Sequence, residues 1–321
     1  MENKLKIIGK EWLNLNPDES AEAFDPERIS GKMILLDFWS YTCFDCLKNL
    51  RFLRLWWDRY KGRNFSIIGI HAPEFEFEKE SGNIEKAIVA HGIRWPVLLD
   101  NDLLNRQNYE IETEPSDLLF GPEGEFLYGH EGAGDYEDME VAIQAAIARV
   151  SGGNDLPEIR VEITEICLPA TPRVYCGFGK GLISNPEGFR FNQVSVYDLF
   201  GELEENTIAL EGKFLVKREY VEARQIGAAV LVRFRASRAD LVVLAPEGTS
   251  ILRVFFNNIP LPKEMYGEDL DDEGELHVSE PRLYNIIKME NLVEGTLKIV
   301  EKRKRFRAYG FSFSGCLEKK T

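Results

Sequence analysis

Two cysteines, Cys43 and Cys46, stand two residues apart and are the side chains of this sequence best suited to chemistry. Two thiols at this spacing can close a small disulfide ring with little movement of the backbone. The apolar run Met33–Trp39 predicts a strand, and the amphipathic stretch from Cys43 to Tyr60 predicts a helix. The free N–H groups and the positive dipole end of a helix start favour a thiolate. The pattern therefore predicts a redox dithiol with Cys43 as the nucleophile and Cys46 as the resolving cysteine.

Two other interpretations of the cysteines stay open, a structural zinc site and an inert buried pair. A structural zinc site needs a second ligand pair at short spacing, and Cys167, Cys176 and Cys316 do not supply one. Cys167 and Cys176 bracket a proline-containing segment and are expected to be buried free thiols, a structural disulfide, or a second redox relay. Cys316 is expected to be a thiol on a strand or in the tail. We expect no metal and no cofactor besides the redox-active Cys43–Cys46 disulfide.

The elements around the dithiol predict an α/β domain. Short apolar runs alternate with helical patterns up to about residue 150, which implies a sheet with parallel members that is covered on both faces. After a strand at 65–71, the pattern predicts a helix at 82–91, strands at 95–99 and 116–120, and a helix at 136–150. The segment Ser151-Gly152-Gly153-Asn154-Asp155 carries no hydrophobic pattern and predicts a linker. The predicted domains are therefore 1–151 and 158–321.

The second domain is predicted to be all β. Helical periodicity almost disappears, and short apolar runs recur at 228–234, 241–244, 251–256, 283–287, 296–300 and 309–313. Short strands at this spacing predict an antiparallel sandwich or jelly roll. Such domains often bind sugars or proteins through aromatic residues, and the candidates here are Phe189, Phe191, Tyr266 and Tyr284. Core packing is the alternative for each of them.

Composition and charge exclude several classes of function. The 321 residues correspond to about two domains of roughly 150 residues, and a hydrophobic content of 44% is enough for two cores. The net charge of −15 disfavours nucleic acid and anionic membranes, because binding to either starts from a positive field. No stretch approaches the roughly 18 uncharged apolar residues that cross a bilayer, and the first residues lack the apolar core of a signal peptide. A cytoplasmic protein without membrane insertion or a nucleic-acid partner is expected.

The acidic segment 269–280 nearly fits the twelve-residue calcium loop. Acids occupy positions 1, 3, 5 and 12 and a glycine occupies position 6, but position 5 is Glu273 rather than Asp or Asn. Prolines on both sides of the segment argue against flanking helices. A solvated hairpin loop is therefore the favoured interpretation, with calcium binding as the alternative.

The run Asp37-Phe38-Trp39 followed by Cys-x-x-Cys resembles thioredoxins, and more closely the TlpA-like redoxin branch of that superfamily. The stretches 68–79, 92–101 and 171–177 are similar to the soluble C-terminal part of DipZ-type proteins. This resemblance implies a thioredoxin-like domain followed by a β-sandwich of the carbohydrate-binding-module type. It also implies a thiol-disulfide oxidoreductase that acts on disulfide-containing proteins.

The resemblance implies roles for two further residues. Asp37, six residues before Cys43, falls where thioredoxins keep a buried carboxyl group that takes a proton from the second cysteine. Burial of a carboxyl group raises its pKa, so the group can exchange protons near neutrality. A satisfied core residue is the alternative for Asp37. Pro115 fits the cis-proline that faces the dithiol and adjoins the substrate segment, with a trans proline at a strand start as the alternative.

The residues expected to bind substrate are Trp39, Tyr41, Thr42, Phe44 and Glu114. Thr42 stands where typical thioredoxins have tryptophan, and Phe44-Asp45 replaces Gly-Pro. Carboxylates of Asp45 and Glu114 near Cys43 would oppose the helix dipole and raise the energy of the thiolate, which makes the disulfide form comparatively stable. We therefore expect a reducing couple, with an electron donor that the sequence does not identify.

Two other classes of function remain as alternatives. A thiol peroxidase is one, but the peroxiredoxin pattern, with a threonine three residues before the reactive cysteine and after a proline, does not occur at Cys43. A non-catalytic adaptor or binding module is the other, and such a protein would tolerate the loss of Cys43 and Cys46.

Overall fold

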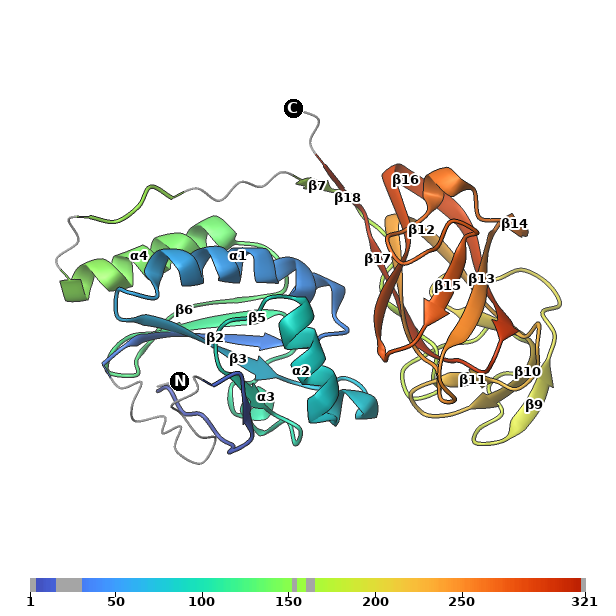
Figure 1. Cartoon of the computed structure of the whole chain (residues 1–321), viewed down its shortest axis with the longest axis horizontal. Helices are drawn as coiled ribbons and strands as arrows, with labels where there is room; N and C mark the ends of the chain where they lie inside the picture. The colour runs from blue at the N-terminus through green and yellow to red at the C-terminus, as the bar shows by residue number, and fades with distance from the viewer. Residues whose placement is uncertain (1–3, 16–30, 152–154, 160–164, 319–321) are drawn as a thin grey trace. The chain divides into compact units, whose positions relative to one another are not determined.

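The computed structural model of the protein describes residues 4–15, 31–151, 155–159 and 165–318 (Figure 1). The chain divides into two compact units, Met1–Glu162 and Ile163–Thr321, each with its own sheet and core. The predicted linker residues Gly152, Gly153 and Asn154 lie outside the described residues. The domain boundary at 151–158 therefore stays a prediction.

In the described part of the first unit, six strands form one sheet in the order β1-β4-β3-β2-β5-β6. The strands are β1 (Trp12–Leu13), β2 (Met33–Trp39), β3 (Phe65–His71), β4 (Val97–Leu99), β5 (Ser116–Phe120) and β6 (Phe126–Glu131). Strands β2, β3 and β4 are parallel, and β5 pairs antiparallel with β2. All residues of β2 are buried, which explains its nearly continuous apolar sequence.

Helices connect these strands and cover the sheet. They are α1 (Phe44–Tyr60), the 3-10 helix η2 (Glu76–Lys79), α2 (Ser81–Ala90), α3 (Leu104–Asn108) and α4 (Tyr136–Ser151). Leu35 of β2 shares a core with α1, α2 and α4, whereas Ile34 and Leu36 face a second core together with Tyr109. The alternation has the period of a strand, so Asp37 lies on the same face as Leu35, toward α1. Among the described helices, none combines the length and the apolar composition needed to span a membrane.

The second unit is built from antiparallel strands, and the described residues contain one large sheet in the order β14-β13-β16-β12-β10-β11-β17-β8. Strand β15 adds to β13, and β9 adds to β10. The elements are β8 (Val174–Tyr175), β9 (Val194–Tyr197), β10 (Ile208–Val216), β11 (Val221–Ala223), β12 (Ala229–Leu244), β13 (Ser250–Phe256), β14 (Ile259–Pro260), the 3-10 helix η3 (Lys263–Met265), β15 (Glu275–Val278), β16 (Arg282–Arg303) and β17 (Arg307–Ser314). The predicted β-rich second half of the chain is confirmed.

Two strands of the second unit are longer than the sequence predicts. The runs 228–234 and 241–244 belong to the single strand β12, and β16 likewise joins two predicted runs. The register between β12 and β16 shifts between Ala236 and Arg238. Such a β-bulge bends a strand without ending it. The polar residues at the bulge interrupt the apolar pattern, and for this reason the sequence suggests two strands.

A short ribbon, which we call the clasp, joins the first and last described strands of the second unit. It consists of β7 (Glu165–Cys167) and β18 (Cys316–Glu318), and their pairing places Cys167 opposite Cys316, with which it forms a disulfide. Cys176 is a free, buried cysteine, and burial raises the pKa of its thiol far above the ordinary value. The predictions of a free thiol at Cys167 and of a bond between Cys167 and Cys176 are therefore wrong. The predicted thiol at Cys316 is wrong as well, although Cys316 lies on a strand as expected. The buried free thiol predicted for Cys176 is confirmed. The strand register brings together two cysteines that are 149 residues apart.

The acidic segment 269–280 forms a turn that leads into β15. The carboxylate of Asp269 accepts a hydrogen bond from Arg282 at 2.6 Å. Asp271 Oδ2 lies 2.7 Å from His277 Nε2. These acids are engaged by partners within the unit, and residues Glu275–Val278 of the segment form the strand β15. This arrangement favours the hairpin interpretation over the calcium loop.

Candidate active site

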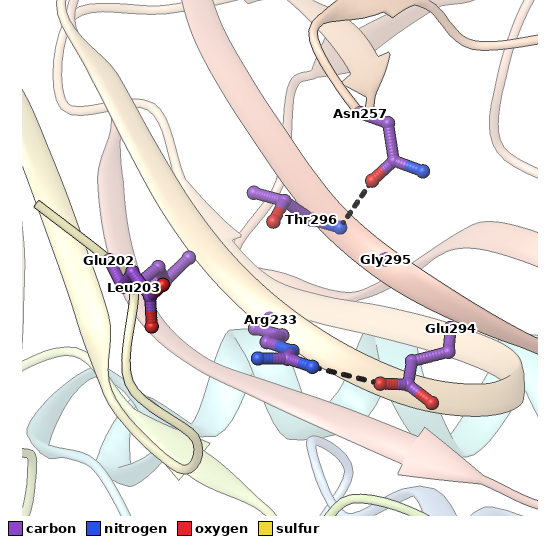
Figure 2. A pocket seen from close by; sticks show the side chains of 7 residues that line it. All are labelled: Glu202, Leu203, Arg233, Asn257, Glu294, Gly295 and Thr296. Atoms are coloured by element: carbon purple, nitrogen blue, oxygen red, sulfur yellow. Dashed lines mark hydrogen bonds and ion pairs between the residues drawn. The ribbon is translucent and has the colours of Figure 1, made fainter.

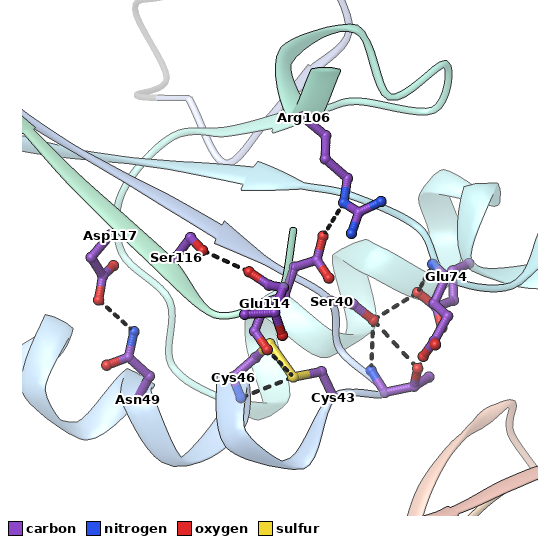
Figure 3. The surroundings of a disulfide bond; sticks show 12 residues. Ser40, Cys43, Cys46, Asn49, Glu74, Arg106, Glu114, Ser116 and Asp117 are labelled. Atoms are coloured by element: carbon purple, nitrogen blue, oxygen red, sulfur yellow. Dashed lines mark hydrogen bonds and ion pairs between the residues drawn. A yellow bond between two sulfur atoms is a disulfide. The ribbon is translucent and has the colours of Figure 1, made fainter. Parts of the chain in front are cut away.

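The two cysteines lie at the start of α1, directly after β2 (Figure 3). Cys43 is the N-cap residue, its Sγ accepts the N–H of Cys46 at 3.1 Å, and the two residues form a disulfide. Cys43 is 9% exposed and Cys46 is 1% exposed, so Cys43 is the sulfur that a partner reaches first. A sulfur that accepts a helix N–H is stabilised as a thiolate. The arrangement suits Cys43 as nucleophile and Cys46 as resolving cysteine.

The segment before β5 faces the disulfide (Figure 3). The Glu114–Pro115 peptide bond is cis, and the Glu114 carbonyl oxygen lies 3.7 Å from Cys43 Sγ. The Glu114 carboxylate accepts a hydrogen bond from Arg106 Nε at 2.6 Å. Burial raises the pKa of Glu114, and Arg106 opposes this rise. The sequence does not predict Arg106 as a neighbour, and its charge offsets part of the repulsion that we expect between Glu114 and a Cys43 thiolate.

Asp37 is 1% exposed and lies on the α1 face of the sheet. Burial raises the pKa of Asp37 well above its ordinary value, and the charge of Asp117 raises it further. Asn49 acts in the opposite direction. A carboxyl group whose pKa is raised toward that of a thiol can exchange a proton with Cys46, as the proton-transfer role predicted for Asp37 requires.

Three of the predicted substrate-binding side chains are not at the surface. These are Trp39, Tyr41 and Thr42. Tyr41 stacks on the ring of His71 with centroids 5.5 Å apart, and Trp39 meets the same ring edge-on at 5.3 Å. Burial lowers the pKa of His71 to about 3, so this imidazole is neutral and packs beneath the loop. Burial disfavours direct substrate contacts for these three side chains, whereas Phe44 is half-buried and Glu114 remains beside the disulfide.

A buried carboxyl group that the sequence does not predict supports the loop before Cys43. Glu78, in η2, accepts hydrogen bonds from the hydroxyl groups of Ser40, at 2.7 Å, and Thr42. It also accepts the backbone N–H of Glu74 at 3.1 Å. Burial raises the pKa of Glu78 to about 7, and the hydroxyl bonds oppose the rise. The hydroxyl groups at 40 and 42 signal the need for an acceptor, but no local pattern assigns that role to a residue 36 positions beyond Thr42.

Glu78→Gln is expected to remove a pH dependence from the stability of the first unit. The folded protein keeps a proton on Glu78 up to about pH 7, whereas the unfolded chain loses it near pH 4.5. Glu78 therefore makes the wild type less stable as pH rises through this window, by on the order of 3 kcal/mol. Urea unfolding followed by tryptophan fluorescence, at both ends of the window, measures the difference between wild type and variant.

All five tryptophans lie between residues 12 and 95, so this signal reports on the first unit. Glu76→Gln is the matched control, because Glu76 lies in the same turn and is exposed. The difference in the free energy of unfolding between Glu76→Gln and wild type should be the same at both ends of the pH window. A pH-independent difference for Glu78→Gln would contradict the prediction.

A pocket of about 420 Å³ lies on the second unit (Figure 2). Its lining residues are Glu202, Leu203, Arg233, Asn257, Glu294, Gly295 and Thr296. Arg233 pairs with Glu294 at 3.1 Å, and Asn257 Oδ1 accepts the backbone N–H of Thr296 at 2.9 Å. None of the predicted aromatic residues belongs to this lining, and Tyr284 is buried in the core. The prediction of an aromatic binding surface gains no support from this pocket.

The sheet order, the Cys-x-x-Cys pair at the start of α1 and the cis-proline facing it together define a thioredoxin-like protein. Residues 171–314, within the second unit, match the family model described as thioredoxin like C-terminal domain. The matched residues include most of the strands of the second unit. The clasp strands lie just outside the matched residues.

Known proteins confirm the resemblance to the DipZ type. DipZ of Mycobacterium tuberculosis is 26% identical over 305 residues, which cover 94% of this chain and 41% of DipZ, so this chain spans less than half of that relative. The thiol-disulfide oxidoreductase YkuV of Bacillus subtilis is 24% identical over 139 residues, which cover 43% of this chain and 89% of YkuV. Among solved structures, a thiol-disulfide isomerase from Corynebacterium glutamicum matches with a TM-score of 0.40 and 18% identity, covering 45% of this chain and 96% of that chain.

Proposed function

We propose that this chain is a thiol-disulfide oxidoreductase that reduces protein disulfides through Cys43 and Cys46. The observation that carries the proposal is the setting of Cys43 Sγ. It accepts a helix N–H at 3.1 Å and belongs to Cys43, which is 9% exposed, against 1% for Cys46. A thiolate in this position is both activated and accessible, and these are the two requirements for attack on a partner disulfide.

The proposed reaction moves two electrons from the dithiol to the partner. The Cys43 thiolate attacks one partner sulfur, the partner S–S bond breaks, and the other sulfur leaves as a thiolate. Cys46 then gives its proton to the ionised carboxyl group of Asp37 and attacks Cys43 Sγ. The Cys43–Cys46 bond forms, the mixed disulfide breaks, and the partner leaves as a dithiol. The disulfide itself is the redox group, so the reaction needs no other cofactor.

An extended segment of the partner is proposed to bind beside Glu114 and Pro115, with Phe44 as apolar surface. The exposed carboxylate of Asp45 and that of Glu114 disfavour a Cys43 thiolate, which stabilises the disulfide form and gives the protein a reducing character. Arg106 weakens the contribution of Glu114. The upstream electron donor has no assigned site in this proposal.

The remaining parts of the proposal concern the second unit and the location. We assign the second unit a jelly-roll sandwich fold of the carbohydrate-binding-module type. A cytoplasmic location is proposed from the sequence. The relative YkuV is named as a thiol-disulfide oxidoreductase, and this name supports a redox activity over an adaptor.

Reduction of insulin tests the proposed activity. Wild-type protein should accelerate the reduction of insulin by dithiothreitol, and Cys43→Ser should return the rate to the background, because the variant cannot form a mixed disulfide. An equal rate for wild type and variant would contradict the activity. Equilibration with glutathione tests the direction: we expect a potential of about −230 mV or lower, and a value near −120 mV would contradict a reducing role.

A further inference from the structure

Asp117 places a second carboxyl group beside Asp37. The two residues are directly opposite each other in the antiparallel pairing of β2 and β5. Leu35 and Leu119, two positions away on each strand, belong to the α1-facing core, so both carboxyl groups point to that face. Directly opposite residues have Cβ atoms about 4.5–5.5 Å apart. Asp37 and Asp117, which we call the carboxyl pair, are therefore close neighbours in the core.

Asn49 links Asp117 of the carboxyl pair to the helix that carries the cysteines (Figure 3). Its side-chain amide donates to Asp117 Oδ2 at 2.9 Å. Asn49 lies one turn after Cys46, and both are buried residues of α1. Asp117 Oδ1 is buried and accepts no hydrogen bond from the described residues. Two buried carboxylates with so few donors repel each other strongly, and the pair is therefore stable with one proton between them.

Other titratable groups surround the carboxyl pair on each packed element. They are Cys46 on α1, His130 on β6 and Tyr136 at the start of α4. The charge of Asp45 raises the pKa of Tyr136, and the charge of Arg51 lowers it. His130 is opposite Asp117 in the sheet, and its Nδ1 lies 3.0 Å from Asp135 Oδ2. Burial raises the pKa of Tyr136 to about 12, so it is neutral. Neither acid of the carboxyl pair forms an ion pair with a described Lys, Arg or His, so a shared proton is the means left to reduce their repulsion.

We propose that Asp117 is a positioning residue for proton transfer, which shares one proton with Asp37 and thereby sets the pH range in which Asp37 accepts the proton of Cys46. The inference rests on the proposed function. As Cys46 Sγ attacks Cys43 Sγ, its proton moves to the ionised member of the carboxyl pair, while the other member stays protonated. The mixed disulfide breaks, and the departing partner thiolate takes up one proton, which returns the carboxyl pair to its singly protonated form.

The first test observes the carboxyl pair directly and requires no activity. A carbon-13 NMR titration of the Asp carboxyl groups, in the disulfide form, compares wild type with Asp117→Asn. Removal of the neighbouring charge should lower the pKa of Asp37 by about 1 to 3 units. Asn49→Leu removes the amide donor and should raise the pKa of Asp37. The two variants therefore shift the titration of Asp37 in opposite directions. An unchanged titration of Asp37 in Asp117→Asn would overturn the proposal.

The second test measures the release step. Reduced protein reacts with 5,5′-dithiobis(2-nitrobenzoate) in two phases, and the second phase is the attack of Cys46 on the mixed disulfide at Cys43. The rate of the second phase should rise with pH to a plateau. Asp117→Asn should move the midpoint of this rise to lower pH and leave the plateau rate unchanged. Asp37→Asn should instead slow the phase about 10²-fold below the ordinary thiol pKa of about 8.5. A slower phase with an unmoved midpoint in Asp117→Asn would indicate a purely structural role and overturn the proposal.

Two controls separate the carboxyl pair from other causes. Glu140, on α4, is a buried acid bonded to Arg59 at 2.6 Å and to the Tyr60 hydroxyl at 2.7 Å. Both partners lie at the far end of α1, about 20 Å along the helix from Cys46. Glu140→Gln should move neither readout. His130→Asn should also leave the midpoint in place, and a shift in either control would overturn the assignment to Asp117. If the protein fails to reduce insulin while the NMR shift is found, the proposed function fails and the carboxyl pair stands.

Discussion

Replacement of Cys46 by serine is expected to leave the protein covalently joined to its partner. Cys43 can still attack a disulfide, but no neighbouring thiol then breaks the mixed bond. A positioned intramolecular group acts like a very high local concentration, so release by external thiols should be at least about 10³-fold slower than in wild type. Non-reducing electrophoresis of Cys46→Ser after incubation with oxidised insulin measures the trapped adduct.

Two cysteine variants control this trap. Cys43→Ser should form no adduct, because Cys46 is 1% exposed and cannot reach a partner. Cys176→Ser in the Cys46→Ser background should trap as much as Cys46→Ser alone, since Cys176 is fully buried and its pKa is strongly raised. Adducts that survive the Cys43→Ser change would assign the nucleophile to another cysteine.

Loss of the clasp disulfide is expected to destabilise the second unit strongly. The Cys167–Cys316 bond closes a loop of 149 residues, and loop-closure entropy for that length corresponds to about 5 kcal/mol of stability. We expect Cys167→Ser to lower the free energy of unfolding by about 3 to 5 kcal/mol, because relaxation of the native state recovers part of the loss. Cys316→Ser and the double variant should show the same loss, since each removes the same bond.

The two units can be followed separately in this measurement. Tryptophan fluorescence reports on the first unit, which contains all five tryptophans, whereas far-ultraviolet circular dichroism also reports on the strands of the second. The clasp variants should lower the midpoint of unfolding of the second unit and leave that of the first unit unchanged. Dithiothreitol should lower the midpoint of the second unit in the wild type to the value of the variants. Ile166→Ser, at an exposed position of the same strand, should change stability by less than about 0.5 kcal/mol. A second transition that is indifferent to Cys167→Ser would contradict the role of the clasp.

The elements that carry the dithiol were predictable because their signals are local. The predicted strand 33–39 is β2 and the predicted helix from Cys43 to Tyr60 is α1, whose first helical residue is Phe44. An apolar run buried on both faces and a helical period each arise from neighbours along the chain. The N-cap position of Cys43 follows from that junction, so its chemistry was accessible from the sequence.

The surroundings of the dithiol were less predictable because they depend on residues far apart in the chain. Thr42 adjoins the nucleophile in sequence, yet its side chain points to Glu78 rather than to a partner. The sequence around Asp117 does not distinguish it from an acidic residue on an exposed edge strand. Only the register between β2 and β5 places Asp117 opposite Asp37. A shift of that register by one residue would turn Asp117 to the other face of the sheet.

By itself, the amino-acid sequence determined that this protein has an α/β half with a Cys-x-x-Cys dithiol at a helix start and an antiparallel β half. Periodicity and spacing are properties of short segments, and they specify these features without any long-range contact. The tertiary structure alone decided that Cys167 bonds to Cys316, that Glu78 supports the loop before Cys43, and that two buried acids lie opposite each other on β2 and β5. These pairings are set by strand register and by the packing of distant segments, and the same local sequences are compatible with other partners until the whole chain has folded.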